Sequence, residues 1–96
     1  MTPKQVRQSV EAALKTMNPA EYKRMKLTGR IEPALDALVA TYNQSVEDGQ
    51  QEALNKLAEK RLTPDQLPLV FAEIEHQAMQ QVLDQIKATT GSRLAS

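Results

Sequence analysis

The polar and apolar residues of this chain repeat with the period of an α-helix. Apolar residues recur three and four positions apart, for example at Val6, Val10 and Leu14, which places them on one helix face. No segment alternates apolar and polar residues in the manner of a half-buried strand. The pattern predicts an all-α fold, a small bundle of four or five helices with a long C-terminal helix.

Three pairs of a polar residue and a proline mark predicted helix starts: Thr2-Pro3, Asn18-Pro19 and Thr63-Pro64. In such a pair the polar side chain accepts hydrogen bonds from the free N–H groups of the first turn. Proline then takes the first helical position, where its missing N–H costs nothing. Glu21 and Gln66 stand three residues after two of these caps, where each completes a capping box.

The first two predicted helices meet at Asn18-Pro19. The inward face of the first consists of Val6, Val10, Ala13, Leu14 and Met17. The second is short, and its inward residues are Tyr22, Met25 and Leu27. It ends at Thr28-Gly29, because glycine readily adopts the left-handed conformation beyond a helix end.

The third predicted helix starts near Ile31, with Pro33 in its first turn. Its apolar series is Ile31, Leu35, Leu38, Val39, Tyr42 and Val46. A glycine inside a helix costs ~1 kcal/mol relative to alanine, and Asp48 can cap a fresh helix at Gly49. We therefore expect a break or kink at Asp48-Gly49; the alternative is one helix that continues to about Arg61.

The last segment is predicted as one turn over residues 64–67 and a long helix from Pro68 to about Thr90, because Pro68 removes one early backbone bond. Its inward face is Val70 or Phe71, Ile74, Ala78, Val82, Leu83 and Ile86. Gly91 is the predicted stop. Residues 1–90 would then form a single helical domain and residues 91–96 a flexible C-terminal tail.

Aromatic residues are scarce: Tyr22, Tyr42 and Phe71 are the only three, and tryptophan is absent. The core must be aliphatic, and each such side chain contributes ~1.5–3 kcal/mol when fully buried. In a chain of 96 residues this makes a thin core, which we expect self-association to complete. The absence of cysteine excludes disulfides and thiolate chemistry.

Features of exported or membrane proteins are not evident. The N-terminal residues MTPKQVRQSVEAALK lack the uninterrupted apolar segment of a signal peptide, and no run approaches the ~20 apolar residues of a membrane span. The first helix has no Trp or Phe to anchor it at a membrane surface. We expect a soluble, cytoplasmic protein with no membrane partner.

The formal net charge of zero conceals an asymmetry. Residues 1–30 contain seven Lys or Arg residues against two glutamates, whereas acids predominate from Ile31 onward. Such a split favours a polyanion, an acidic partner or head-to-tail self-association.

Residue types that carry ordinary catalysis are mostly missing. There is no Gly-x-Ser-x-Gly motif, His76 is the only histidine, and the three glycines stand apart from one another. Glu73 and His76 have the spacing of one half of a carboxylate-bridged metal site in a helical bundle, but the motif occurs once, and we favour a polar helix surface. The sequence predicts no enzyme, no metal and no cofactor.

A basic cluster is the first candidate for binding. It consists of Lys23, Arg24, Lys26 and Arg30. On a helix, three of these form a stripe that can neutralise phosphates. Against this, the next helix begins with the acidic residues Glu32 and Asp36, which repel them. A nucleic-acid-binding regulator is therefore the alternative function.

The last helix is the second candidate, because Gln77, Gln81 and Gln85 form a neutral stripe beside its apolar face. Polar but uncharged surfaces are typical of interface cores. The preferred function is a non-catalytic helical protein-interaction module (adaptor, chaperone-like or inhibitory) that binds another protein and forms a homodimer. The predicted interface residues are Phe71, Ile74, Gln77, Gln81, Val82 and Gln85.

Overall fold

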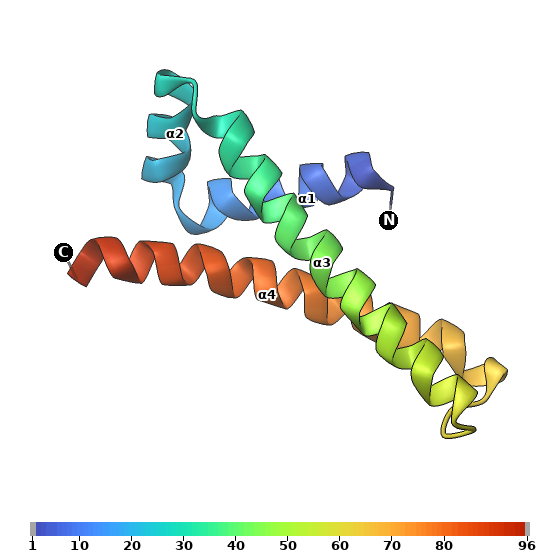
Figure 1. The fold of residues 1–96 in the computed structure, drawn as a ribbon. Coiled ribbons are helices and arrows are strands. Elements are labelled where there is room, and N and C mark those ends of the chain that lie inside the picture. The colour runs from blue at the N-terminus through green and yellow to red at the C-terminus, as the bar shows by residue number, and fades with distance from the viewer. Residues whose placement is uncertain (1, 96) are drawn as a thin grey trace.

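The computed structural model describes residues 2–95, and the side chains of residues 2–88. Within this range the protein is all-α and has no strand, which confirms the predicted fold class (Figure 1). Four α-helices and one short 3-10 turn follow in order: α1 (Pro3–Met17), α2 (Pro19–Thr28), α3 (Ile31–Ala58), η1 (Pro64–Gln66) and α4 (Leu67–Ala95).

The proline-marked helix starts are confirmed. Thr2 accepts a hydrogen bond from the Gln5 N–H at 3.2 Å and donates its own N–H to Gln5 Oε1 at 2.9 Å. Asn18 Oδ1 caps α2 by accepting from the Glu21 N–H at 3.4 Å. Gly29 ends α2 with φ 71°, the left-handed conformation that glycine adopts without strain.

The predicted break at Asp48-Gly49 is wrong, because α3 runs without interruption from Ile31 to Ala58. Gly49 instead lies against α4: a Cβ atom at this position would lie 2.7 Å from Ile74 Cγ2. The glycine therefore lets two helices approach closely, and the packing gained outweighs its low helix propensity.

The long C-terminal helix is present, but its bounds differ from the prediction. α4 begins at Leu67 and continues past Thr90 and Gly91 to Ala95, so the segment predicted as a tail is helical up to that residue. A lone glycine weakens a helix but does not stop it unless the chain turns there.

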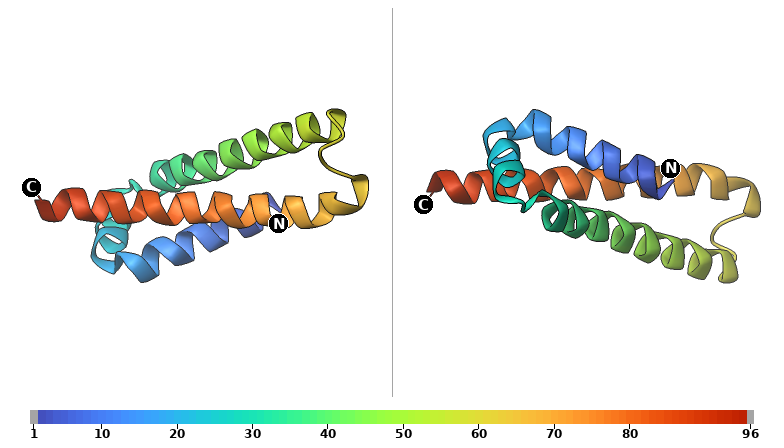
Figure 2. Two further views of the ribbon diagram at one scale, coloured as in Figure 1. Left: turned by 90° about the horizontal axis from the view of Figure 1, so that it is seen from below. Right: turned by 90° about the horizontal axis from the view of Figure 1, so that it is seen from above.

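Three helices build the core, and each contributes one buried stripe. The buried residues are Val6, Val10 and Leu14 from α1, Leu35, Leu38 and Tyr42 from α3, and Ala78, Val82 and Ile86 from α4. α2 closes one end of this group, where Tyr22 and Met25 pack against the core (Figure 2). Leu27 is 80% exposed, so its predicted inward position is wrong. It follows Met25 by two residues, which turns it about 200° around the helix.

Beyond α1 the molecule narrows to two helices. α1 lies alongside α4 and does not reach the far end of the α3–α4 hairpin (Figures 1 and 2). We call residues 46–77 the arm, and α1, α2, residues 31–45 and residues 78–95 the base. Ala53 is the only buried residue of the arm, all of whose residues the structure describes. The longest dimension of the molecule is 51 Å.

Candidate interaction surfaces

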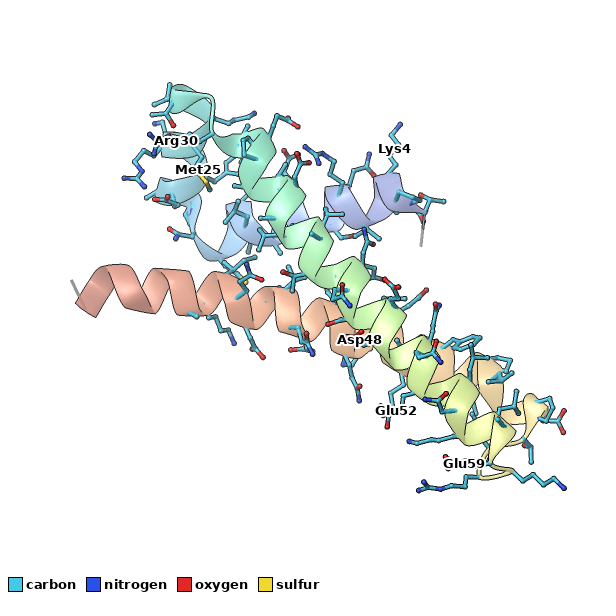
Figure 3. The ribbon with its side chains drawn as sticks, in the orientation of Figure 1. Lys4, Met25, Arg30, Asp48, Glu52 and Glu59 are labelled. Atoms are coloured by element: carbon cyan, nitrogen blue, oxygen red, sulfur yellow. The ribbon has the colours of Figure 1, made fainter. Side chains whose placement is uncertain are left out.

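One side of the α3–α4 seam is a polar groove. Gly49 is part of its lining, and the other lining residues come from both helices: Thr41, Gln44, Ser45, Asp48 and Glu52 from α3, and Gln77 and Gln81 from α4. Figure 3 shows Asp48 and Glu52 along the arm portion of α3. Gln44 donates to Asp48 at 2.9 Å, and Lys56 Nζ lies 3.3 Å from Glu52. Much of the polar lining is therefore already engaged in local contacts.

The glutamine stripe of α4 connects the two long helices within one chain. The Thr41 hydroxyl donates to Gln85 Oε1 at 2.7 Å, and the Ser45 hydroxyl donates to Gln81 Oε1. Gln77 donates to Glu73 at 3.4 Å. The three glutamines are exposed, but the hydrogen bonds of Gln81 and Gln85 already join α3 to α4, whereas that of Gln77 lies within α4.

The remaining predicted interface residues lie in different surroundings. Val82 has no exposed surface and belongs to the core of the base, so it is not accessible to a partner and its assignment to an interface is wrong. Ile74 is half-buried against Gly49. Phe71 is half-buried in the arm. The predicted set thus mixes core, seam and surface positions, because one helix face packs against different neighbours along its length.

The opposite side of α3 carries a surface that the sequence reasoning missed. Leu54 follows Glu52 by two residues, which places it about 200° around the helix and away from the polar groove. It is 50% exposed. We call the row in which it lies the α3 stripe: Glu47, Gln50, Leu54 and Ala58, all of them exposed. The signal was present in the sequence, since the apolar residues of α3 cover more of the helix than one seam can bury.

A second exposed leucine lies on α4. Leu69 is 77% exposed near the start of that helix. Its neighbours in the wall of the seam, Val70 and Ile74, are half-buried. Leu69 precedes Val70 by one residue, so it points away from that wall.

The predicted basic cluster lies at the α2 end of the base. Lys23, Lys26 and Arg30 are exposed, and Figure 3 shows Arg30 at this end. Among the described residues no carboxylate forms an ion pair with these three cations. Arg24 differs, because its guanidinium pairs with Glu21 at 2.7 Å. Three of the four predicted contact residues therefore present unneutralised charge.

Lys15 joins the same surface from the last turn of α1. Its Nζ lies 5.9 Å from the centre of the Tyr22 ring, and the Nζ of Lys26 lies 5.4 Å from the same point. Both distances are within the range of cation–π attraction. The tertiary fold brings Lys15 to this cluster, so no local sequence pattern identifies it.

The acids that follow the basic cluster are neutralised within the chain. Arg7 of α1 pairs with Asp36 at 2.6 Å and also with Glu32. The hydrogen bond that Arg7 donates to Asp36 raises the pKa of Arg7 above its ordinary value, and the charges of both acids act in the same direction. Glu32 and Asp36 therefore repel phosphates less strongly than their formal charges imply.

Metal-site and membrane candidates gain no geometric support. His76 is exposed, and no group of three or more His, Cys, Asp or Glu side chains in the described residues could hold a metal ion. None of the helices in this part of the chain is both long and apolar enough to span a membrane.

Comparisons with known proteins do not assign the chain to a family. No family model matches it, and no curated protein or solved structure is significantly similar to it.

Proposed function

We propose that the protein is a non-catalytic interaction module in which the base provides the stable fold and the arm binds a protein partner. The single observation that carries this proposal is the unequal burial of the two long helices. In the base, α3 and α4 each bury a stripe of three apolar residues in the core that they share with α1. In the arm they bury only Ala53 and leave Leu54 half exposed. A partner that covers the arm supplies the contacts that α1 supplies in the base.

The glycines support a binding role over a catalytic one. Gly29 adopts the left-handed conformation at the end of α2, and Gly49 allows the contact with Ile74. Both positions have a structural explanation, and neither contributes to a phosphate-binding loop. Among the polar residues of the groove, Thr41 and Ser45 donate hydrogen bonds to α4, and Gln44 donates to Asp48 within α3.

A pull-down with the purified chain tests this proposal. We expect Leu54→Lys to lose bound partner, because the substitution places a charge in the covered surface, whereas Leu27→Lys on α2 retains it. Circular dichroism should show equal helix content for both variants, since both positions are solvent-exposed. Equal capture by the two variants would show that the arm is not the binding element.

A nucleic-acid-binding regulator is the second candidate, supported by the unneutralised charges of Lys23, Lys26 and Arg30 and by the pairing of Arg7 with the nearby acids. Binding through phosphate contacts weakens steeply with salt. We expect duplex DNA to bind the chain at low salt and Lys23→Glu/Lys26→Glu to abolish this binding. Lys4→Glu, at the opposite end of α1 (Figure 3), is the control. Equal binding by both variants would refute this candidate.

A further inference from the structure

We propose that Tyr22 and the two lysines beside it, Lys15 and Lys26, form a phosphate-binding site for the backbone of a nucleic acid. This inference rests on the second candidate function, nucleic-acid binding by the base. It adds to that surface a lysine of another helix, Lys15. It also assigns Tyr22 the role of a positioning residue, which holds the two ammonium groups near one point.

The ring of Tyr22 is fixed by the core of the base. Tyr22 lies in the first turn of α2, and its half-buried side chain packs against the core cluster. The Nζ of Lys15 lies 5.9 Å from the ring centre, and the Nζ of Lys26 lies 5.4 Å from it. Cation–π attraction favours both positions. The ring therefore restricts two lysine side chains that are otherwise flexible.

The two ammonium groups are close enough to attract the same anion. Both distances are measured from one ring centre, so the nitrogens are closer together than the sum of the two distances. A phosphate located between them lies within the Debye length of both, which is ~8 Å at physiological ionic strength. One anion therefore relieves the mutual repulsion of the two lysines and gains two attractive contacts.

The neighbouring acids do not neutralise this pair of lysines. Within the described part of the chain, no carboxylate forms an ion pair with Lys15 or Lys26. Glu21, which precedes Tyr22 in the sequence, is engaged by Arg24 at 2.7 Å. The charges of the two lysines are thus left for an external anion.

Lys23 extends the site along α2. It precedes Lys26 by three residues, so the two lie on the same side of the helix, and both are exposed. Cations from two helices thus form a row, which matches a chain of regularly spaced phosphates better than a single anion. Lysine binds phosphate as a point charge and reads no base edge in doing so. We therefore expect binding that does not depend on base sequence.

A nucleic acid fits this surface better than an anionic bilayer does. Stable attachment to a bilayer needs an apolar contribution in addition to cations. The structure describes every residue of α2, and this helix exposes one large hydrophobic side chain, Leu27. Contact with a nucleic-acid backbone needs charge alone.

Fluorescence anisotropy with a labelled duplex DNA of arbitrary sequence, over a salt series of about 50–200 mM, tests the site. Lys15→Gln should weaken binding about three- to tenfold at low salt and reduce the slope of log K against log salt by about one. Lys4→Gln removes the same charge from the other end of α1 (Figure 3) and should leave the slope nearly unchanged. Equal affinities and slopes for the two variants would overturn the proposal.

Tyr22→Leu tests the positioning role, because it removes the ring but no charge. It should weaken binding and reduce the slope at least as much as Lys15→Gln, whereas Tyr22→Phe keeps the ring and should bind like the wild type. Adding Lys15→Gln to Tyr22→Leu should cause little further loss, since both changes remove the same contact. Losses that add in full would show that Tyr22 does not position Lys15.

Circular dichroism at the assay temperature establishes which of these variants are folded. Lys15 is exposed, so Lys15→Gln tests the site even if the Tyr22→Leu chain fails to fold.

The outcomes separate this site from the candidate function on which it rests. If Lys23→Glu/Lys26→Glu abolishes DNA binding but Lys15→Gln binds like the wild type, the base binds nucleic acid and the proposed site is wrong. If the wild-type chain binds no duplex at low salt, both fail. If it binds vesicles that contain phosphatidylserine but no DNA, the partner is a bilayer and the proposal is likewise wrong.

Discussion

The base and the arm are built from the same two helices but differ in what covers them. In the base, α1 lies across α3 and α4, and each of the three helices buries three residues. In the arm the same helices pack mainly against each other, and Ala53 alone is buried. The difference shows that helix length and burial are separate properties: α3 has 28 residues, yet only part of it belongs to a core.

The arm is held by a close seam instead of a core. Gly49 lies directly against Ile74, and Lys56 pairs with Glu52 along α3. At the tip Lys60 adopts φ 60°, which is uncommon for a residue with a side chain. Its N–H donates to the Leu57 carbonyl at 3.1 Å, which closes the helix end. These contacts shape the hairpin but leave its outer faces to solvent.

The largest expected effect is a difference in unfolding free energy between two matched leucine substitutions, one in the base and one in the arm. Leu35→Ala should lower the free energy of unfolding by about 2–5 kcal/mol, the range for a fully buried leucine, because Leu35 is 1% exposed. Leu54→Ala should cost less than about 1 kcal/mol in the monomer. Urea denaturation at concentrations below association measures both. Equal losses would show that the arm carries as much of the stability as the base.

The next effect concerns the seam. Gly49→Ala should destabilise the chain by about 1–3 kcal/mol, the cost of overpacking, because the new Cβ meets the stiff branched side chain of Ile74 at 2.7 Å. In an Ile74→Ala background the same substitution should be neutral or stabilising, since alanine is the better helix former by ~1 kcal/mol. A double-mutant cycle measures this coupling. An additive cycle would mean that Gly49 does not serve close packing.

A smaller effect is a pH dependence that originates in the base. Burial raises the pKa of Tyr42, and the charge of Glu75 raises it further. The folded state thus favours the neutral phenol, so this contribution to stability is complete below the ordinary tyrosine pKa of about 10 and is lost as the pH rises through the folded value. Tyr42→Phe should flatten the alkaline decline in urea stability. An unchanged decline would show that Tyr42 does not contribute to it.

The smallest expected effect is at the surface of the base. Arg7→Gln should lower the melting temperature slightly at low salt and remove part of its salt dependence, because Arg7 pairs with Glu32 and Asp36 at the surface. Lys4→Gln removes a charge from the same helix, where no ion pair forms among the described residues, and is the control. An equal change in both variants would show that net charge, not the pairing, is responsible.

The base was more predictable from the sequence than the arm for a physical reason. Proline pairs and helical periodicity are local, and they identified the starts of the first two helices of the base, at Pro3 and Pro19. Gly49 was misread because its role depends on Ile74, which lies 25 residues later in the chain. Leu27 was misread because a short helix at the end of a bundle has only one covered side.

The candidate surfaces show the same contrast between features set by local sequence and features set by tertiary contacts. The basic residues Lys23, Lys26 and Arg30 are neighbours in sequence and were identified together. Lys15 reaches the same surface through Tyr22 of another helix, and Val82 turned out to belong to the core. Periodicity identifies the apolar positions of α3 but does not show which of them are covered, so the α3 stripe follows from the fold, in which α1 leaves the arm uncovered.

Amide hydrogen exchange of the purified chain tests the central claim most directly, that the base is a stable fold by itself whereas the arm lacks a core. Protection should follow local stability. We predict that the amides of residues 35–42 are strongly protected and that those of residues 50–58 exchange much faster. Equal protection of the two segments would contradict the account.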